Sequence, residues 1–376
     1  MYRGPMPTTN HDSSNGSGLI NLVAELEYRA TGSAAFPRLK DVLIPAIPDH
    51  NTTVLVLFDG LGSHQLDHPG AHDLASAHIG SVDAPFPTTT TVSLATIATG
   101  LPPSQHGLIA YQLWNPDIGK VINTIHMTTM WGERVEQRHE DFLPGPNLWE
   151  RMSASGVDVV TVQPESFDRT PLSLALYRGA SFVPYSSTSE AVERTVEAAD
   201  QPGRFVFLYI PHVDFAAHVA GQRSSEYDTA INEANGVWAN LAGKLKPDVL
   251  LVGTADHGHI DIVPANKVRL SKADEEGLIL YGDARALFVR GDGAGLADGL
   301  PGTWVPYDDL MGSWGPGPLH EAFEGRRPDG IIFANDDYAI FHSRSNDRLI
   351  GHHGGLSEEE RRIPVLVRGG RVDRKS

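Results

Sequence analysis

Carboxylate and imidazole side chains occur in four separate segments, each beside a short apolar run of the chain. The segments contribute Asp59; Asp214 and His218; Asp256 and His257; and His352 and His353. Each segment alone has an ordinary structural explanation, because such residues often cap helices, form surface ion pairs or occupy turns. With one histidine taken from the adjacent pair His352 and His353, three Asp and three His offer only oxygen and nitrogen donors, which suit zinc or another divalent ion such as Mn²⁺. Six ligands exceed one tetrahedral site, so we expect two divalent ions.

Four consecutive threonines, residues 88–91, precede the helical pattern VSLATIA. One explanation is structural, since threonine is a favoured N-cap residue. The other is catalytic, since a hydroxyl at a helix N-terminus lies where backbone N–H groups favour a phosphoryl group. Three carboxylates and one alkoxide would balance two dications, so such a site could accept an anionic phosphoryl group although the chain carries a net charge of −17.

The elements that must position these side chains alternate between strands and helices. Apolar, β-branched runs occupy residues 52–58, 157–163, 204–210, 247–254 and 363–369, and helical patterns occupy residues 19–30, 146–156, 189–200 and 225–245. Strands that are apolar throughout are typical of a sheet covered on both faces. The order predicts an α/β fold with a mostly parallel central sheet sandwiched by helices. In such sheets the chemistry lies beyond the carboxyl ends of the strands.

The domain organisation follows from changes in composition along the chain. We expect a catalytic core built from residues 19–259 and 346–376. Residues 260–345 are rich in Gly and Pro and predict a smaller inserted lobe or long active-site loops. Residues 1–18 are polar and rich in turn-forming residues, which predicts a disordered leader.

Composition excludes several classes of function. Thirty Lys and Arg stand against 47 Asp and Glu, with no basic block, so a nucleic-acid scaffold or an anionic membrane surface is not an expected partner. The chain has no cysteine, which excludes disulfides, thiolate catalysis and Cys-ligated metal. No run reaches about 18 apolar residues, and the N-terminal region lacks an apolar signal segment, so we expect a cytoplasmic protein.

The order of the motifs resembles one superfamily. An Asp ending the first strand is followed by FPTTTT, ATGLPPSQHG, Asp and His four residues apart, DHG and finally HGG, over residues 50–370. This order resembles the alkaline phosphatase superfamily and, within it, the type I phosphodiesterase/nucleotide pyrophosphatase branch. The nucleophilic threonine of that branch lies nine residues before the Thr of the TGL run, here Thr99. The resemblance therefore implies Thr90 as nucleophile, with Thr89 and Thr91 as the alternatives.

The resemblance also implies how the ligands divide between two ions. Asp214, His218 and His353 would hold one ion, and Asp59, Asp256, His257 and Thr90 would hold the other. His353 is preferred to His352 because it directly precedes two glycines. Three further histidines, His106, His212 and His259, are expected to be structural. Many nucleotide pyrophosphatases have Asn three residues after the nucleophile, and Ser93 occupies that position as a candidate substrate-binding residue.

The expected activity is hydrolysis of small-molecule phosphodiester or pyrophosphate bonds, on phosphoester or nucleotide-like substrates, through a phosphothreonine intermediate. Three alternatives stay open: a phosphomonoesterase, a phosphonoacetate-type hydrolase and a non-catalytic metal-binding module. Preference for diesters over monoesters is expected because the basic residues nearest to Thr90 in sequence are Lys40 and Lys120. Distant arginines that could fold over the site are Arg269, Arg285 and Arg344. The sequence leaves the oligomeric state open.

Overall fold

The computed structural model describes residues 16–40 and 43–369. Its larger part is built on a seven-stranded sheet with the order β2-β18-β9-β1-β8-β6-β7. These strands are β1 (Thr52–Phe58), β2 (His78–Asp83), β6 (Asp158–Pro164), β7 (Ser181–Tyr185), β8 (Arg204–Ile210), β9 (Val249–Thr254) and β18 (Arg362–Val367). β1 is central and pairs in parallel with β8 and β9. β8 pairs in parallel with β6, and β6 with β7.

One strand of this sheet, β18, runs against its neighbours and pairs antiparallel with both β9 and β2. Every residue of β1 and of β9 is buried. That burial requires cover on both faces, which the apolar composition of these strands predicted. The predicted mostly parallel sheet is confirmed.

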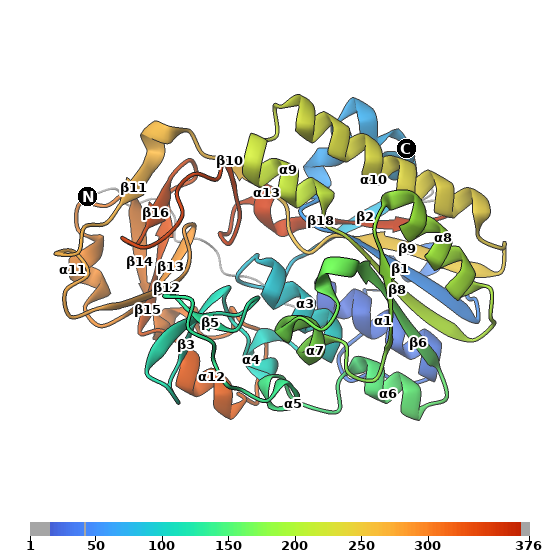
Figure 1. Ribbon diagram of the computed structural model, residues 1–376, viewed down its shortest axis with the longest axis horizontal. Helices are drawn as coiled ribbons and strands as arrows, with labels where there is room; N and C mark the ends of the chain where they lie inside the picture. The colour runs from blue at the N-terminus through green and yellow to red at the C-terminus, as the bar shows by residue number, and fades with distance from the viewer. Residues whose placement is uncertain (1–15, 41–42, 370–376) are drawn as a thin grey trace.

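Helices cover both faces of the sheet (Figure 1). The helices α8 (Thr188–Ala199), α9 (His212–Ala220) and α10 (Ser225–Lys244) lie on one face, and α1 (Leu19–Thr31), α3 (Thr90–Thr99), α6 (Leu148–Ala154) and α7 (Pro171–Leu176) lie on the other. The short α2 (His72–Ala77) packs against α10. The four helices predicted from periodicity correspond to α1, α6, α8 and α10.

A second seven-stranded sheet forms the other part of the molecule, at the left of Figure 1, with the order β14-β15-β13-β12-β3-β4-β5. Its strands are β3 (Gln112–Asn115), β4 (Lys120–Asn123), β5 (Thr128–Thr129), β12 (Ile279–Asp283), β13 (Ala286–Arg290), β14 (Gly302–Pro306) and β15 (Gly330–Ala334). Its neighbours pair antiparallel throughout. The short helices α4 (Pro103–His106), α5 (His139–Phe142), α11 (Gly293–Ala297) and α12 (Glu321–Arg326) connect or flank its strands.

This second sheet differs from the lobe expected over residues 260–345. Three of its strands come from residues 112–129, which we assigned to the core. They join the sheet where Gln112 of β3 pairs with Gly282 of β12. The three strands are two to four residues long, so their pairing depends on a partner far away in sequence that a local pattern cannot indicate.

Two small strand pairs link the sheets to the C-terminal segment. β10 (Ile260–Asp261) pairs antiparallel with β17 (Gly351–His352), and β11 (Lys267–Arg269) pairs in parallel with β16 (Ala339–Phe341). A short helix, α13 (Glu358–Arg361), then leads into β18.

The predicted leader falls mainly on residues 1–15, which lie outside the described residues. Residues 16–18 differ from a disordered leader, because the carbonyl of Gly16 accepts a hydrogen bond from the backbone of Lys40 and that of Ser17 from Asp83. Within the described ranges, none of the helices combines the length and the apolar character needed to cross a membrane.

Candidate active site

Three neighbouring strands carry the predicted aspartates to one edge of the first sheet. Asp59 directly follows β1, and Asp256 follows β9 after one intervening residue. β8, on the other side of β1, leads through Pro211 into α9, which contains Asp214. Because these strands are parallel, their carboxyl ends meet at the same edge, as predicted.

The first turns of α9 position Asp214 and His218. The backbone N–H of Asp214 donates to the carbonyl of Asp59 at 3.0 Å, which ties the start of α9 to the end of β1. His218 lies one turn later, with its Nε2 3.3 Å from Asp214 Oδ1. Asp214 and His218, four residues apart, therefore lie on one face of α9, as their spacing predicts.

The C-terminal segment brings His353, and not His352, to this edge. His352 lies in β17 opposite Ile260 of β10, and its Nε2 is 3.0 Å from the carbonyl of Leu349. His353 Nε2 lies 3.9 Å from Asp214 Oδ1. Adjacent side chains of an extended segment point to opposite sides, which separates the two histidines.

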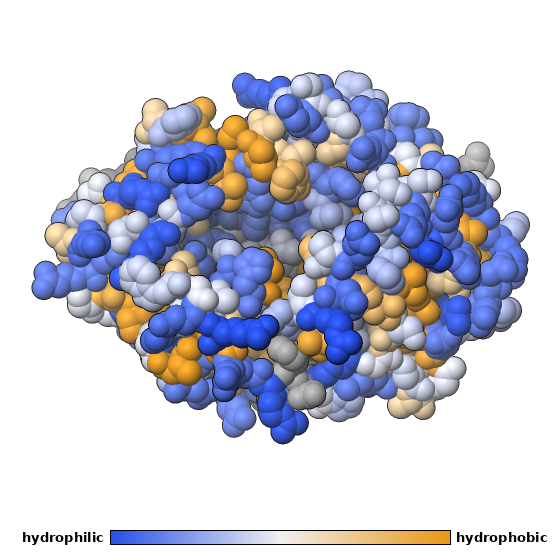
Figure 2. Space-filling model, viewed as in Figure 1, coloured by the Kyte–Doolittle hydropathy of each residue, from blue (hydrophilic) through white to orange (hydrophobic). Residues whose placement is uncertain are grey.

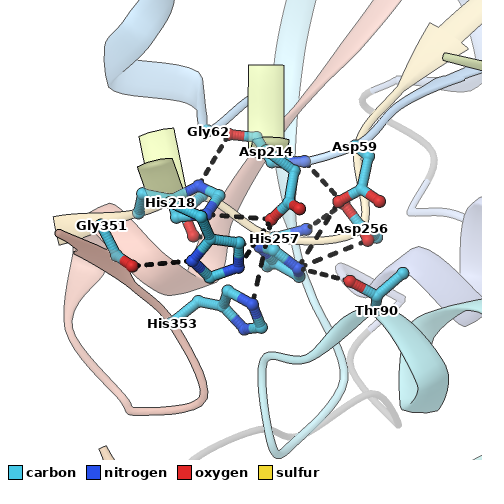
Figure 3. Close-up of polar contacts among 12 residues, drawn as sticks. Asp59, Gly62, Thr90, Asp214, His218, Asp256, His257, Gly351 and His353 are labelled. Atoms are coloured by element: carbon cyan, nitrogen blue, oxygen red, sulfur yellow. Dashed lines mark hydrogen bonds and ion pairs between the residues drawn. The ribbon is translucent and has the colours of Figure 1, made fainter. Parts of the chain in front are cut away.

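The candidate ligands form two groups, in each of which the ligand atoms lie within 4.8 Å of one another. One group consists of Asp59, Asp256 and His257, and the other of Asp214, His218, His259 and His353. Figure 3 shows side chains of the two groups converging from separate elements. The rings of His257 and His353 stack with centroids 3.7 Å apart and join the groups.

His259, which we expected to be structural, has a fully buried ring that lies within the second group of candidate ligands. Its Nε2 lies 3.0 Å from Asp214 Oδ1. His259 lies two residues after His257, and the two rings meet edge-on with centroids 5.2 Å apart. That spacing is the sequence signal that could have identified His259.

The four histidines share one hydrogen-bonding arrangement. Each ring contacts a backbone carbonyl through Nδ1, at 2.8 Å for His218, 2.9 Å for His353, 3.1 Å for His257 and 3.3 Å for His259. A carbonyl oxygen only accepts, so Nδ1 carries a proton in each ring, and Nε2 is the nitrogen that can bind an ion when the ring is neutral. Such a second hydrogen bond fixes the tautomer and orientation of metal-ligating histidines.

The unpaired buried atoms of the site fit divalent metal ions. Four of these atoms have no hydrogen-bond partner among the described residues: Asp59 Oδ1, Asp214 Oδ1, Asp256 Oδ2 and His259 Nε2. A buried carboxylate oxygen without a partner is costly, and a cation between such atoms would remove that cost. Carboxylate oxygen and imidazole nitrogen are ligands that zinc and related ions accept.

The electrostatics of the site agree with this donor set. Burial raises the pKa of Asp59 well above its ordinary value, and the nearby charges of Asp214 and Asp256 raise it further. Burial alone would raise the pKa of Asp214, but the neighbouring His218 outweighs it and holds the value well below the ordinary one. Burial, together with His257, keeps the pKa of His353 well below its ordinary value. Three carboxylates this close repel one another without compensating positive charge.

Thr90 is the accessible hydroxyl of the threonine run. The side chains of Thr88, Thr89 and Thr91 are buried, whereas Thr90 is half-buried at the first position of α3. Its Oγ1 lies 3.0 Å from His257 Nε2. The N-cap residue Thr89 makes no side-chain capping hydrogen bond. The side chain of the N-cap threonine therefore does not cap α3, and the hydroxyl of Thr90 is the one that faces the candidate ligands.

Two other hydroxyls near Thr90 hold the site together. Thr88 Oγ1 donates to the carbonyl of Gly355 at 2.9 Å and accepts from the backbone of Gly354 at 3.1 Å, which anchors the segment after His353. The buried Ser93 hydroxyl donates to the carbonyl of Asp256 at 2.8 Å. This differs from the substrate contact expected for Ser93, because its hydrogen bond instead positions the end of β9.

Thr90 lines two recesses whose linings differ in character. Figure 2 shows a hollow in the middle of the face between the two parts of the molecule. One recess of about 480 Å³ is lined by Thr90, His353 and the rim residues Tyr111 and Arg344. A second recess, of about 320 Å³, lies beside Thr90 and is lined by apolar and aromatic side chains such as Leu94, Phe167, Leu176 and Tyr209.

Of the three distant arginines, Arg344 reaches the site. Arg269 pairs with Asp347 at 2.8 Å, and Arg285 is buried against Glu360 at 3.2 Å. Arg344 lines the recess that contains Thr90, and its guanidinium lies 4.5 Å from the ring centroid of Trp131. Two aromatic residues follow the QHG turn in the sequence, and of these Tyr111 lines the recess and Trp114 does not.

Comparison with known families decides the relationship. The family described as Type I phosphodiesterase / nucleotide pyrophosphatase matches residues 53–294. This chain is a member of that family. The match includes Asp59, Thr90, Asp214 and His257, and it makes the chain a hydrolase of the phosphodiesterase/nucleotide pyrophosphatase class, as the motif order indicated.

Relatives of this phosphodiesterase family member extend the comparison. Human ectonucleotide pyrophosphatase/phosphodiesterase family member 5 is 23% identical over 362 residues, which cover 88% of this chain and 71% of the relative. Murine ectonucleotide pyrophosphatase/phosphodiesterase 5, solved as an inactive threonine-to-alanine variant with AMP, superposes with a TM-score of 0.64 at 20% identity, over 84% of this chain and 87% of that one. Phosphonoacetate hydrolase from Sinorhizobium meliloti, solved with phosphonoacetate, gives 0.64 at 15% identity, over 88% and 92%. These structures share the fold of this chain.

Proposed function

We propose that this chain hydrolyses phosphodiester or phosphoanhydride bonds of small molecules at a two-ion site, with Thr90 as nucleophile. Asp59, Asp256, His257 and Thr90 would hold one ion, and the group around Asp214 would hold the other. Zn²⁺ suits these ligands best, and Mn²⁺ is the alternative. When bound, such ions lower the pKa of an attacking hydroxyl and stabilise negative charge on phosphoryl oxygens.

The chain's own residues supply the covalent steps of the proposal. Thr90 Oγ1 loses its proton and bonds to phosphorus, while the bond from phosphorus to the leaving oxygen breaks. The leaving oxygen keeps the electron pair and takes up a proton. Water then hydrolyses the phosphothreonine, which restores the Thr90 hydroxyl and releases the second product. The position of Thr90 at the start of α3 directs backbone N–H groups toward the phosphoryl oxygens.

One observation carries this proposal: the half-buried hydroxyl of the threonine run, Thr90, lies 3.0 Å from His257 beside buried carboxylate oxygens that have no hydrogen-bond partner among the described residues. The two recesses that Thr90 lines leave room for two substituents on a phosphoryl group, which favours a diester or anhydride. The AMP complex of the murine relative supports a nucleotide-like substrate.

The proposal is tested by turnover of bis(p-nitrophenyl) phosphate by the purified protein, before chelation, after chelation and after addition of Zn²⁺ or Mn²⁺. We expect activity that chelation removes and one of the ions restores. Activity that persists in protein shown by metal analysis to be metal-free would contradict it.

A second candidate function, hydrolysis of a phosphonate or phosphomonoester, is favoured by Arg344. A guanidinium on the rim of the recess offers positive charge to a second anionic group of the substrate. The phosphonoacetate complex of the Sinorhizobium meliloti relative is an example of a ligand with such a second group. Phosphate release from phosphonoacetate and from p-nitrophenyl phosphate, compared with diester turnover, distinguishes the two candidates.

A further inference from the structure

His259 faces Asp214 without a hydrogen bond between them. His259 Nε2 and Asp214 Oδ1 are 3.0 Å apart, and among the described residues neither atom has a hydrogen-bond partner. The opposite ring nitrogen, Nδ1, lies 3.3 Å from the carbonyl of Gly60. Since that carbonyl accepts a hydrogen bond from Nδ1, Nε2 keeps its lone pair, and it lies beside the carboxylate oxygen without being aimed at it. A cation bound by both atoms would give each of them a partner.

The other tautomer would give His259 a purely structural role, as a donor from Nε2 to Asp214. It would leave an unprotonated Nδ1 facing the carbonyl of Gly60, so that two acceptors would meet inside the protein. A buried acceptor pair of that kind is unfavourable. The local geometry therefore favours the tautomer in which Nε2 is free to bind a cation.

The surroundings of His259 place it beside two predicted ligands. Its ring meets the ring of His218 edge-on, with centroids 5.1 Å apart, and that of His353 with centroids 5.3 Å apart. Gly60 leaves room for the ring, because a Cβ at Gly60 would lie 2.5 Å from Cε1 of His259. Gly60 also has a φ of 75°, a conformation that favours glycine.

We propose that His259 is a fourth protein ligand of the ion held by Asp214, His218 and His353. This inference deepens the proposed function and rests on its two-ion site. The first ion then has four protein donors, all from buried or half-buried side chains. The second ion has three carboxylate or imidazole donors, Asp59, Asp256 and His257, and its fourth protein donor is the hydroxyl of Thr90, which is not among the usual strong zinc ligands. The two ions are therefore held unequally, and the first stays bound under chelation that removes the second.

The test uses the full chain, stripped of metal and loaded with Co²⁺, with His259→Ala as the variant and His352→Ala as the matched control. His352 is a buried histidine next to a predicted ligand, but it belongs to neither donor group. Metal analysis gives the number of ions, chelator competition gives their affinities, and the visible Co²⁺ spectrum reports the ligands of the ion.

For wild-type protein and His352→Ala we expect one tight and one weaker Co²⁺ ion. In His259→Ala the tight ion should bind at least about tenfold more weakly, with a changed Co²⁺ spectrum, because a nitrogen donor is lost. His259→Leu, which keeps more of the side-chain volume, should behave in the same way and serves if the alanine variant does not fold.

Two results would overturn the inference while leaving the proposed function intact. One is unchanged affinity for both ions in the His259 variants. The other is weaker binding with an unchanged spectrum, which would make His259 a positioning residue for Asp214. A wild-type chain that binds no Co²⁺ at all would instead overturn the two-ion proposal itself.

Discussion

The imidazole rings of His257 and His353 stack at a centroid distance of 3.7 Å with an angle of 19° between their planes. His257 follows strand β9 of the central sheet, whereas His353 comes from the C-terminal segment, and each belongs to a different donor group. This contact places the two proposed metal positions next to each other, so that one substrate phosphoryl group can face both. Two-metal sites of phosphoryl-transfer enzymes place their ions in this way.

Removal of one ligand from each group should empty mainly that group. We expect His353→Ala to lose the ion near Asp214, and Asp256→Asn to lose the ion near Thr90. Asparagine is chosen at position 256 because Asp256 Oδ1 accepts from the backbone of Gly60 and His257 at 2.9 and 3.0 Å, and an amide oxygen can keep those bonds. Metal analysis should fall from two ions to one per chain in each variant.

Both variants should lose far more activity than stability, because the core of a large α/β sheet does not depend on metal. Thermal unfolding of the metal-free proteins checks this point. If both ions remain bound in the two variants, the assignment of ligands to groups is wrong.

Substitutions along the threonine run should distinguish a nucleophilic role of Thr90 from a role in capping helix α3. Thr90→Ala should abolish turnover, and Thr90→Ser should keep part of it, because serine retains the hydroxyl. Thr91→Ala is the matched control, since the Thr91 hydroxyl is buried and has no hydrogen-bond partner among the described residues. Steady-state turnover measures the effect, and the free energy of unfolding of Thr90→Ala should change by no more than about 1 kcal/mol. If Thr91→Ala loses activity while Thr90→Ala stays active, Thr91 is the nucleophile and the assignment to Thr90 is wrong.

The ratio of catalytic efficiency for bis(p-nitrophenyl) phosphate to that for p-nitrophenyl phosphate should exceed one. The monoester dianion brings one more negative charge to a site where the proposed ions and ligands already balance. Arg344→Ala should raise this ratio further, because it removes the cation that helps the more highly charged substrate. Arg348→Ala, an exposed residue of the same segment outside the recess, is the control. A ratio well below one would contradict the diester preference and indicate a phosphomonoesterase.

The pH dependence of metal binding should follow His218. Burial lowers the pKa of His218, but the Asp214 carboxylate outweighs it and raises the value from 6.5 to about 9 in the metal-free protein. Below that pH an ion must displace a proton from His218, so affinity for the ion near Asp214 should rise with pH up to about 9 and then level off. Chelator competition across this range measures the effect.

The free energy of unfolding of the metal-free protein should change with pH in the opposite direction and fall as pH rises. Because the pKa of His218 is raised on folding, its contribution to stability is complete below pH 6.5 and is lost as pH rises through about 9.

The control for both pH predictions is Asp283→Asn. Burial raises the pKa of nearby Asp283 to about 7, so this variant removes the titration of Asp283 and leaves that of His218. A metal affinity that does not change with pH in this variant would contradict the role of His218.

The strand ends and the helix face could be predicted from the sequence. Asp59 and Asp256 follow apolar runs that can only be central strands, and parallel strands bring their ends to one edge. The pair Asp214 and His218 follows from helix periodicity, which depends only on nearby residues.

Other features depend on contacts that local patterns do not contain. His259 lies in the donor group around Asp214, and a structural histidine has the same local sequence pattern. Arg344, in the segment after β16, lines the recess together with residues far away in sequence. The hydroxyl of Ser93 donates to the carbonyl of Asp256, a contact over 163 residues that spacing alone does not indicate.

The central claim is the covalent role of Thr90, and trapping the intermediate tests it most directly. Protein turning over bis(p-nitrophenyl) phosphate is quenched in acid, digested and analysed by mass spectrometry, with Thr90→Ala treated in parallel. The account predicts a p-nitrophenyl phosphoryl adduct on the peptide that contains Thr90, since only one p-nitrophenol leaves in the first step. Fragmentation should assign the adduct to this residue, and the alanine variant should carry no adduct. Turnover by active wild-type protein with the adduct on Thr89 or Thr91 would contradict the account.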